Sequence, residues 1–348
     1  MSQRVTAVLS PFRRLPKVEL HRHLEGTLRL STMLDVARQH SMTVPEDVLA
    51  LSNLVQMQAT DSYTFRTFLS KFDTLRLFYR SPDVIDRITR EAVEDAAHDN
   101  VKYMELRFTP VALSRAERFP LHDVMDWVIS ASQAEANAQG ITVRLIASVN
   151  RHESPELAEQ VAWLAAERRD KGMLAMDLAG NEAEFSSEPF YGVFREAREA
   201  GLHICIHAGE WGPAANIREA IEHLGAERIA HGVRVLEDES VVQLARERAT
   251  PFEVCVTSNY QSGVIEDERM HPLPRMLEAG LNVTVNTDDP SISRITLSDE
   301  YNVVCNELGV PMEALRERIV AGAEAAFLPE PQRHQLVESL KAELASLD

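Results

Sequence analysis

Short apolar runs alternate with amphipathic stretches along most of the chain, and this alternation constrains the fold more than any other feature. Several amphipathic stretches end at a glycine just before the next apolar run, as helices commonly do. Apolar strands separated by helices predict a parallel sheet. About eight such units predict a closed (β/α)8 barrel, also called a TIM barrel. The candidate strands are Lys17–His21, Lys102–Phe108, Thr142–Val149, Met173–Leu178, His203–His207, Arg228–Ala230, Phe252–Val256 and Asn282–Asn286.

Extra helices are expected after the first strand and at the C-terminus. Leu28–His40 and Ser62–Tyr79 both have helical patterning, and the chain beyond Ser298 indicates further helices that pack against the barrel. No low-complexity segment or Pro/Gly-rich linker divides the chain. Because barrels of this type routinely exceed about 250 residues as one unit, we expect residues 1–348 to form a single domain.

The second inserted helix is rich in phenylalanine and contains Phe65, Phe68, Phe72 and Phe78. Aromatic residues at this spacing are usually core residues. An insertion at the catalytic end of a barrel can instead form an apolar lid over a substrate. We favour the lid, and we expect Phe65 and Phe68 to contact the substrate.

The composition limits the class of partner and the compartment. The net charge is −18, which argues against nucleic acid or an anionic membrane surface as a partner. Three scattered cysteines are too few for a disulfide framework. The N-terminus lacks an apolar core of signal-peptide length, and no apolar run reaches the roughly 18 residues of a membrane span. We therefore expect a soluble, cytoplasmic protein.

Chemically distinctive residues stand at the carboxyl ends of several predicted strands, where the active sites of such barrels lie. A single histidine is more often a core or surface residue than a ligand, and an Asp-Asp-Pro sequence alone could be a turn. His203 stays ambiguous, because it shares a strand face with His207. The coincidence at five strand ends favours a catalytic site. The residues are His21, His23, Gly180, His207, Glu210, His231, Asp288 and Asp289.

Four of these residues have the chemistry of a mononuclear metal site. His21 and His23 are two apart on one strand, so both imidazoles point to the same face. Together with His207 and the carboxylate of Asp288, they suit a divalent ion of the zinc class. A water molecule would complete the coordination shell, and the metal would lower its pKa toward neutrality.

The remaining residues suit proton transfer beside that metal. His231 is free to orient or deprotonate the water, and Glu210 can deliver a proton to a substrate. Asp289 can hold the water or accept a bond from the substrate. Gly180 has no side chain, which permits close approach of a flat ring. Such a site suits hydrolysis at an electron-poor ring carbon.

At this point the sequence resembles a known family, the adenosine/adenine deaminases of the amidohydrolase superfamily. The resemblance extends from the first strand to the eighth. It implies a (β/α)8 barrel, one zinc ion per chain, and deamination of an aminopurine at C6 with release of ammonia. The stretches that carry it are 17–26 (KVELHRHLEG), 176–182 (MDLAGNE), 207–210 (HAGE), 227–232 (ERIAHG), 257–259 (TSN) and 286–290 (NTDDP).

The resemblance also assigns roles by matching position. It implies metal ligation by His21, His23, His207 and Asp288. It further implies that Glu210 protonates N1 of the purine and that His231 activates the water. Asp289 would contact N7 and the water, and Gly180 would contact N3.

One position bears on the sugar part of the substrate. Adenosine deaminases usually carry Asp at the position of Glu25, where the carboxylate contacts the ribose. Glu is frequent there in the branch that acts on adenine or on modified nucleosides. The stretch 176–182, with Asn181, instead resembles the nucleoside deaminases. We expect adenosine or 2′-deoxyadenosine as the substrate.

Other substrates and functions stay open as alternatives. The substrate alternatives are adenine, a 5′-modified adenosine such as aminodeoxyfutalosine, and an N6-substituted adenosine. A 5′-phosphate would need basic residues, for which Arg22, Arg66 and Arg76 are candidates. The other functional alternatives are a different mononuclear amidohydrolase and a non-catalytic relative.

Overall fold

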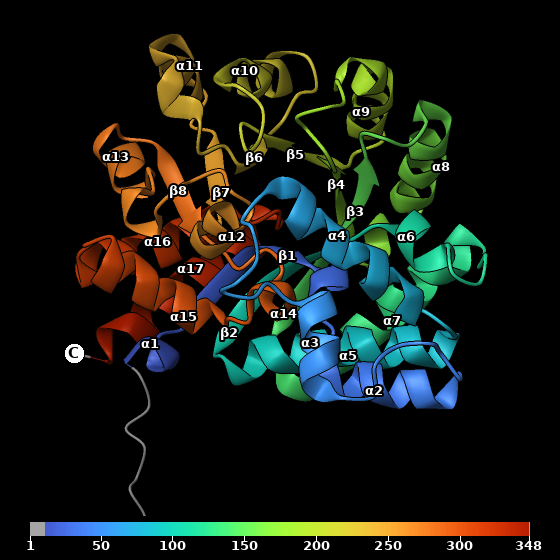
Figure 1. Ribbon diagram of the computed structural model, residues 1–348. Coiled ribbons are helices and arrows are strands. Elements are labelled where there is room, and N and C mark those ends of the chain that lie inside the picture. The colour runs from blue at the N-terminus through green and yellow to red at the C-terminus, as the bar shows by residue number, and fades with distance from the viewer. Residues whose placement is uncertain (1–10, 348) are drawn as a thin grey trace, which may run out of the picture.

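Eight parallel strands form a nearly closed barrel at the centre of the molecule. The structure is a computed structural model that describes residues 11–347, and the strands follow one another around a single sheet in chain order. This arrangement, with helices outside it, confirms the predicted (β/α)8 barrel (Figure 1). The strands are β1 (Lys17–His23), β2 (Val101–Phe108), β3 (Thr142–Asn150), β4 (Met173–Ala179), β5 (His203–Ala208), β6 (Arg228–His231), β7 (Pro251–Val254) and β8 (Asn282–Val285).

The barrel closes between the ends of β8 and β1. Arg22 and Asp288 form an isolated parallel bridge. The Asp288 N–H donates to the His21 carbonyl at 3.0 Å, and the His23 N–H donates to the Asp288 carbonyl at 2.8 Å. This seam therefore holds residues from the ends of the first and last strands within hydrogen-bond distance of each other.

Some strand boundaries differ from those expected from the sequence. β1 continues two residues further, to His23, and β8 ends one residue earlier, at Val285. The prediction for β7 was wrong at its end, because α12 (Val256–Gln261) begins where the strand was expected to continue. The carboxylate of Glu300 accepts hydrogen bonds from the backbone N–H groups of Val256 and Thr257, which stabilises that helix start.

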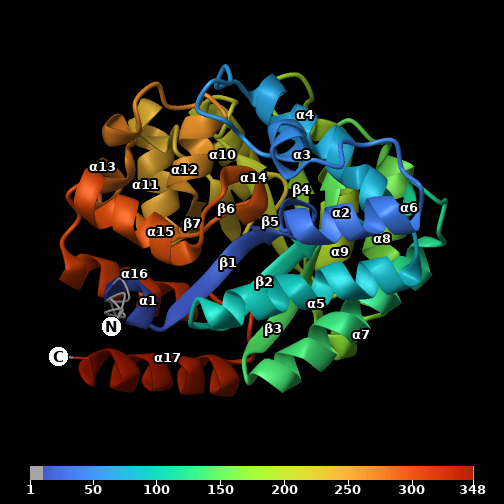
Figure 2. The ribbon, with the colours of Figure 1, turned by 60° about the horizontal axis from the view of Figure 1, so that its bottom comes forward.

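Helices surround the barrel, and extra helices lie after β1 and at the C-terminus as expected (Figure 1). The insertion contains α3, which was not expected. α3 and α4 lie at one end of the molecule and α17 lies at the other (Figure 2). The helices are α1 (Pro11–Arg14), α2 (Leu30–Gln39), α3 (Val48–Val55), α4 (Phe65–Leu75), α5 (Pro82–His98), α6 (Pro110–Ser114), α7 (Leu121–Gln139), α8 (Pro155–Ala166), α9 (Tyr191–Glu199), α10 (Ala214–Glu222), α11 (Glu239–Glu247), α12 (Val256–Gln261), α13 (Leu273–Glu278), α14 (Pro290–Ser293), α15 (Leu297–Asn302), α16 (Met312–Glu324) and α17 (Glu330–Ala345).

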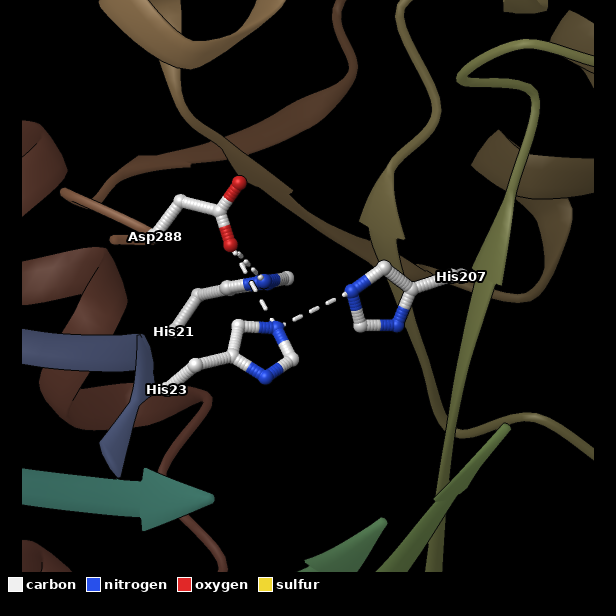
Figure 3. A group of neighbouring side chains, drawn as sticks. All are labelled: His21, His23, His207 and Asp288. Atoms are coloured by element: carbon white, nitrogen blue, oxygen red, sulfur yellow. Dashed lines mark hydrogen bonds and ion pairs between the residues drawn. The ribbon is translucent and has the colours of Figure 1, made fainter. Parts of the chain in front are cut away.

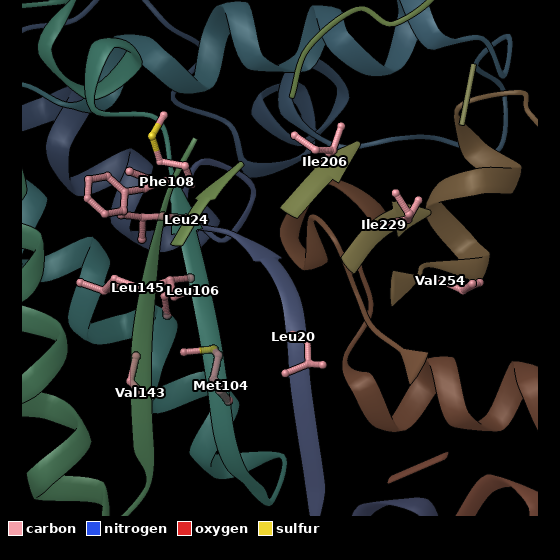
Figure 4. Close-up of a cluster of buried hydrophobic side chains, with 14 of the residues drawn as sticks. Leu20, Leu24, Met104, Leu106, Phe108, Val143, Leu145, Ile206, Ile229 and Val254 are labelled. Carbon is pink, nitrogen blue, oxygen red and sulfur yellow. The ribbon is translucent and has the colours of Figure 1, made fainter. Parts of the chain in front are cut away.

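Successive residues of a strand face either the surrounding helices or the interior of the barrel. On β2, Met104, Leu106 and Phe108 belong to the main apolar cluster, part of which Figure 4 shows. The residues between them, Glu105 and Arg107, are charged and bond to residues of β6 and β7 across the barrel. Because side chains alternate along a strand, the apolar set of β2 packs outward and its charged set points into the barrel. The interior therefore combines charged side chains with a second, smaller apolar cluster.

The described helices show no membrane-spanning character. Within residues 11–347, none is both long enough and apolar enough to cross a bilayer.

Candidate active site

Four potential ligand atoms meet at the carboxyl ends of β1, β5 and β8. The side chains of His21, His23, His207 and Asp288 each offer one such atom, and all four lie within 4.8 Å of one another (Figure 3). His21 Nε2 lies 3.0 Å from Asp288 Oδ1. His23 Nε2 lies 3.3 Å from both His207 Nε2 and Asp288 Oδ1. Tetrahedral zinc with bonds of about 2.0 Å separates its ligands by about 3.3 Å, so these spacings fit.

The protonation pattern of this group also fits a cation. His21 Nδ1 lies 3.0 Å from the Glu253 carboxylate, and His207 Nδ1 lies 2.9 Å from that of Asp177. A neutral ring that donates from Nδ1 presents a lone pair at Nε2. His21 Nε2 is buried without a hydrogen bond, although it faces a carboxylate oxygen. Lone pairs that converge in this way are stabilised by a metal ion.

Burial favours the neutral imidazole at two of the three histidines, because it lowers the pKa of His207 and lowers the pKa of His23 well below the usual histidine value. At His21 the effect of burial is outweighed by the carboxylates of Asp288 and Glu253, which raise the pKa. Neutral imidazole is the form that binds metals. The donor set therefore fits a divalent ion on both geometry and charge.

Glu210 and His231 lie beside this group. His231 Nε2 is 3.7 Å from Glu210 Oε2 and 3.8 Å from Asp288 Oδ2. Burial raises the pKa of Glu210 well above its usual value, and the charges of Asp288 and Glu182 raise it further. A carboxyl group with a raised pKa keeps its proton to a higher pH than usual and can donate it.

Three further predicted residues line the same cavity. Glu25 accepts a hydrogen bond from the Thr109 N–H through Oε1 at 2.7 Å, and its Oε2 is buried without a hydrogen bond. Asp289 Oδ1 is likewise buried without one. Burial raises the pKa of both carboxyl groups. Gly180 has a φ of +88°, and all three residues face a space of about 430 Å³.

Two site residues have unusual backbone conformations. His231 has a φ of +62° and Asp288 a φ of +65°. Non-glycine residues seldom adopt this left-handed region, which costs about 1–3 kcal/mol. At both positions the conformation turns a side chain from the end of a strand toward the shared cavity.

Helix α4 forms one wall of the cavity. Phe65 and Phe68 both line it, together with Phe72. Phe68 is only 3% exposed and also belongs to the main apolar cluster. The helix therefore serves as core and as cavity wall, and its opening as a lid stays a prediction.

The three arginines considered for a 5′-phosphate lie in different places. Arg66 and Arg76 line the cavity, where Arg66 pairs with Glu184 at 2.5 Å. Arg76 lies over the Phe72 ring at 5.6 Å, and within residues 11–347 no carboxylate forms an ion pair with it. Arg22 was wrongly considered, because its guanidinium lies outside this cavity, where it pairs with Glu19 at 2.7 Å and donates to the Ala92 carbonyl of α5.

His203 lies away from the site, although it shares a strand with His207. Its Nδ1 is 2.9 Å from Glu227, and its ring stacks on Phe327 at the amino ends of the strands. The ambiguity about this histidine is thereby removed.

Several residues that support the site were not singled out from the sequence. The carboxylate of Glu182 accepts hydrogen bonds from four consecutive backbone N–H groups, at positions 209–212. Ser258 Oγ donates to Asp288 Oδ2 at 2.7 Å, and Asn259 Nδ2 lies 3.1 Å from His231 Nδ1. All three residues stand within the stretches that carry the family resemblance, which was the available signal.

Comparisons with known proteins agree on one family. A sequence model for the family described as Adenosine deaminase matches residues 16–343. The adenosine deaminase of Salmonella paratyphi C is 37% identical over 331 residues, which cover 94% of this chain and 98% of that protein. A solved adenine deaminase from Arthrobacter aurescens has a TM-score of 0.88 at 27% identity, over 95% of this chain and 99% of that one. A solved Arabidopsis N6-mAMP deaminase has a TM-score of 0.85 at 27% identity, with the same two coverages.

Proposed function

The chain belongs to the adenosine deaminase family and is a hydrolytic deaminase, and from that premise we propose adenosine and 2′-deoxyadenosine as its substrates. The products are inosine or 2′-deoxyinosine and ammonia. The observation that carries the proposal is the position of Glu210 and His231 beside His21, His23, His207 and Asp288, which we call the metal-type group. We propose one zinc ion per chain, held by His21, His23, His207 and Asp288.

Two side chains transfer protons in the proposed reaction, and other residues bind the purine ring. Zinc, when bound, supplies a positive charge that makes a water molecule more acidic. His231 accepts a proton from the water that adds to C6, and Glu210 donates a proton to N1. His231 then passes its proton to N6, the C6–N6 bond breaks, and the amino group leaves as ammonia. The hydroxyl group at C6 gives its proton to Glu210 as it becomes the carbonyl of the product. Asp289, whose pKa is raised by burial, donates a hydrogen bond from its protonated carboxyl group to N7, and Gly180 allows the N3 edge to approach the backbone.

The cavity closes around the ring in this proposal. Phe65 and Phe68 cover the purine from α4 and exclude bulk water, which strengthens the interactions of buried charges. Glu25 faces the sugar with its free Oε2. We further propose a cytoplasmic location, because Cys205, Cys255 and Cys305 are all free thiols.

A second candidate substrate is an adenosine 5′-monophosphate, with or without an N6 substituent. Arg76 favours it, because this cavity-lining guanidinium has no ion-pair partner among the described residues. Glu25 argues against it, because its carboxyl group lies in the same cavity and, when ionised, repels a phosphate. The solved N6-mAMP deaminase shows that a close structural relative acts on such a compound.

A parallel assay separates these possibilities. The zinc-loaded protein is incubated with adenosine, 2′-deoxyadenosine, adenine, AMP and N6-methyl-AMP, and both ammonia and the purine absorbance are followed. Rapid turnover of the two nucleosides, lost after chelation and restored by zinc, is the expected result. Turnover of adenine alone, or of the nucleotides alone, would show that the substrate is that compound and not adenosine. Ammonia release from none of them would contradict the proposal.

A further inference from the structure

Arg107 joins the supports of two metal-type histidines across the barrel interior. It stands on β2 and is fully buried. One terminal nitrogen, Nη2, donates to Glu253 Oε2 on β7 at 2.6 Å and to the Leu20 carbonyl at 2.8 Å. The other, Nη1, lies 3.3 Å from Asp177 Oδ2 on β4. The two prongs of one guanidinium thus reach two carboxylates on strands far apart in the barrel.

Each of these carboxylates also accepts a hydrogen bond from the ring of a histidine in the metal-type group. Glu253 Oε2 accepts from His21 Nδ1, and Asp177 Oδ1 accepts from His207 Nδ1. The links form one continuous path: His21, Glu253, Arg107, Asp177, His207. The path places one planar cation between two ring-orienting anions. A hydrogen bond at Nδ1 decides which way the Nε2 lone pair points, so the path sets the angle between the two rings.

Stability alone gives no reason for this arrangement. Buried ion pairs are often no more stabilising than apolar side chains of similar size. The Nε atom of Arg107 is buried without a hydrogen bond, which is unfavourable by itself. A rigid fork does supply what an apolar residue cannot, namely a fixed distance and direction between two carboxylates.

We propose that Arg107 is a positioning residue that orients His21 and His207 together for metal binding. The inference rests on the metal site of the proposed function, but not on the identity of the substrate. It distinguishes these two histidines from His23, whose ring nitrogens form no hydrogen bond or ion pair within residues 11–347 except with His207 and Asp288. Loss of the fork should therefore weaken the metal site as a unit.

Zinc affinity, measured by competition with a chromophoric chelator, tests the proposal without reference to turnover. Arg107→Lys keeps a positive charge but loses the planar fork, and we expect it to bind zinc at least tenfold more weakly, within the range usual for such supports. The matched control is Arg168→Met, which removes a buried arginine that follows α8 and pairs with Asp126 of α7 at 2.9 Å. This control should lower thermal stability and leave zinc affinity within twofold of the wild type.

The absorption spectrum of the cobalt(II)-loaded protein gives a second readout. Ligand-field bands report the arrangement of ligands, so Arg107→Lys should change their positions or intensities while Arg168→Met leaves them unchanged. Equal zinc affinity and equal spectra in Arg107→Lys and the wild type would overturn the proposal. A wild type that binds no zinc would instead overturn the metal site itself.

Two carboxamide variants keep the test decisive if Arg107→Lys does not fold. Asp177→Asn and Glu253→Gln should each weaken zinc binding. In the double variant the combined loss should differ from the product of the two single losses, because both carboxylates act through one arginine. Strictly multiplicative losses would show two independent supports and would contradict the proposed link.

Discussion

Two buried carboxyl groups in the cavity each have one oxygen that forms no hydrogen bond. Asp289 Oδ1 and Glu25 Oε2 are both buried without hydrogen bonds. Gly26 permits this crowding, because a Cβ at that position would overlap the Asp289 carboxylate. Unpaired buried oxygens are unfavourable in the free protein, so they gain most from a ligand that forms hydrogen bonds with them. At the residue scale, the site is built to receive such a ligand.

The proton carried by Glu210 gives the first prediction. Glu210→Gln keeps the shape of the side chain but removes the acidic proton, and we expect kcat to fall at least a hundredfold. Zinc content should stay at the wild-type level, because Glu210 is outside the four-residue metal group. Steady-state kinetics and metal analysis of the same sample measure both. Undiminished turnover would remove Glu210 from the mechanism.

The length of the side chain at position 25 gives the second prediction. Glu25→Asp withdraws the carboxylate by one methylene from the space assigned to the sugar. We expect the ratio of kcat/KM for adenosine to that for adenine to rise at least threefold. Measuring both substrates with one enzyme preparation cancels errors in active-site concentration. An unchanged ratio would mean that this residue does not read the sugar.

At the scale of elements, the loop after β5 depends on a residue from the loop after β4. The Glu182 carboxylate collects the N–H groups of residues 209–212 and also accepts from Asn216 Nδ2 at 2.9 Å. These contacts fold the backbone of residues 209–212 around the Glu182 carboxylate and fix the orientation of the Glu210 side chain. One loop thus positions Glu210, the proposed proton donor, on its neighbour.

The third prediction concerns this loop. Glu182→Gln exchanges one acceptor oxygen for a donor amide, so some N–H groups of the loop lose their partner. We expect kcat to fall about 10- to 100-fold while zinc affinity is kept. The matched control is Glu184→Gln, which removes the exposed pair with Arg66 at the cavity mouth. Equal kinetics in the two variants would show that the anion does not position the loop.

Sequence patterns captured the elements better than their junctions. Apolar runs identified all eight strands, because burial on both faces leaves a strong signal. The end of β7 was misjudged because a distant carboxylate, that of Glu300, starts a helix there. Arg107 and Glu253 were overlooked for a related reason. A charged residue inside an apolar run has meaning only when its partner on another strand is known.

At the scale of the whole molecule, the barrel joins the catalytic end to the opposite end. Arg228 on β6 donates to Glu253 Oε1 at 2.6 Å and to the Ala325 carbonyl at 2.9 Å, between α16 and α17. Its guanidinium lies 3.6 Å from the centre of the Phe327 ring. The C-terminal helices thereby anchor the charged interior that supports the metal-type group. This continuity supports our proposal that residues 1–348 form a single domain.

Acid sensitivity of the fold gives the fourth prediction, through His271. This residue is buried, its Nδ1 accepts from the Leu273 N–H at 3.1 Å, and its Nε2 lies 3.3 Å from Asn259 Oδ1. Burial lowers the pKa of His271 to about 3. The folded state therefore keeps the ring neutral, whereas the unfolded chain takes up a proton below a pH of about 6.5.

Stability should consequently be highest above pH 6.5 and should decline as the pH falls from there toward 3. The contribution of one such group reaches about 1.4 kcal/mol per pH unit. His271→Gln removes the titrating ring, so its free energy of unfolding should fall by about 1.6 kcal/mol less than that of the wild type between pH 6.5 and 5. Urea unfolding at both pH values measures this difference. The metal-type histidines are present in both proteins, so their protonation cancels in the comparison, and parallel pH profiles would exclude His271 as the acid-sensitive group.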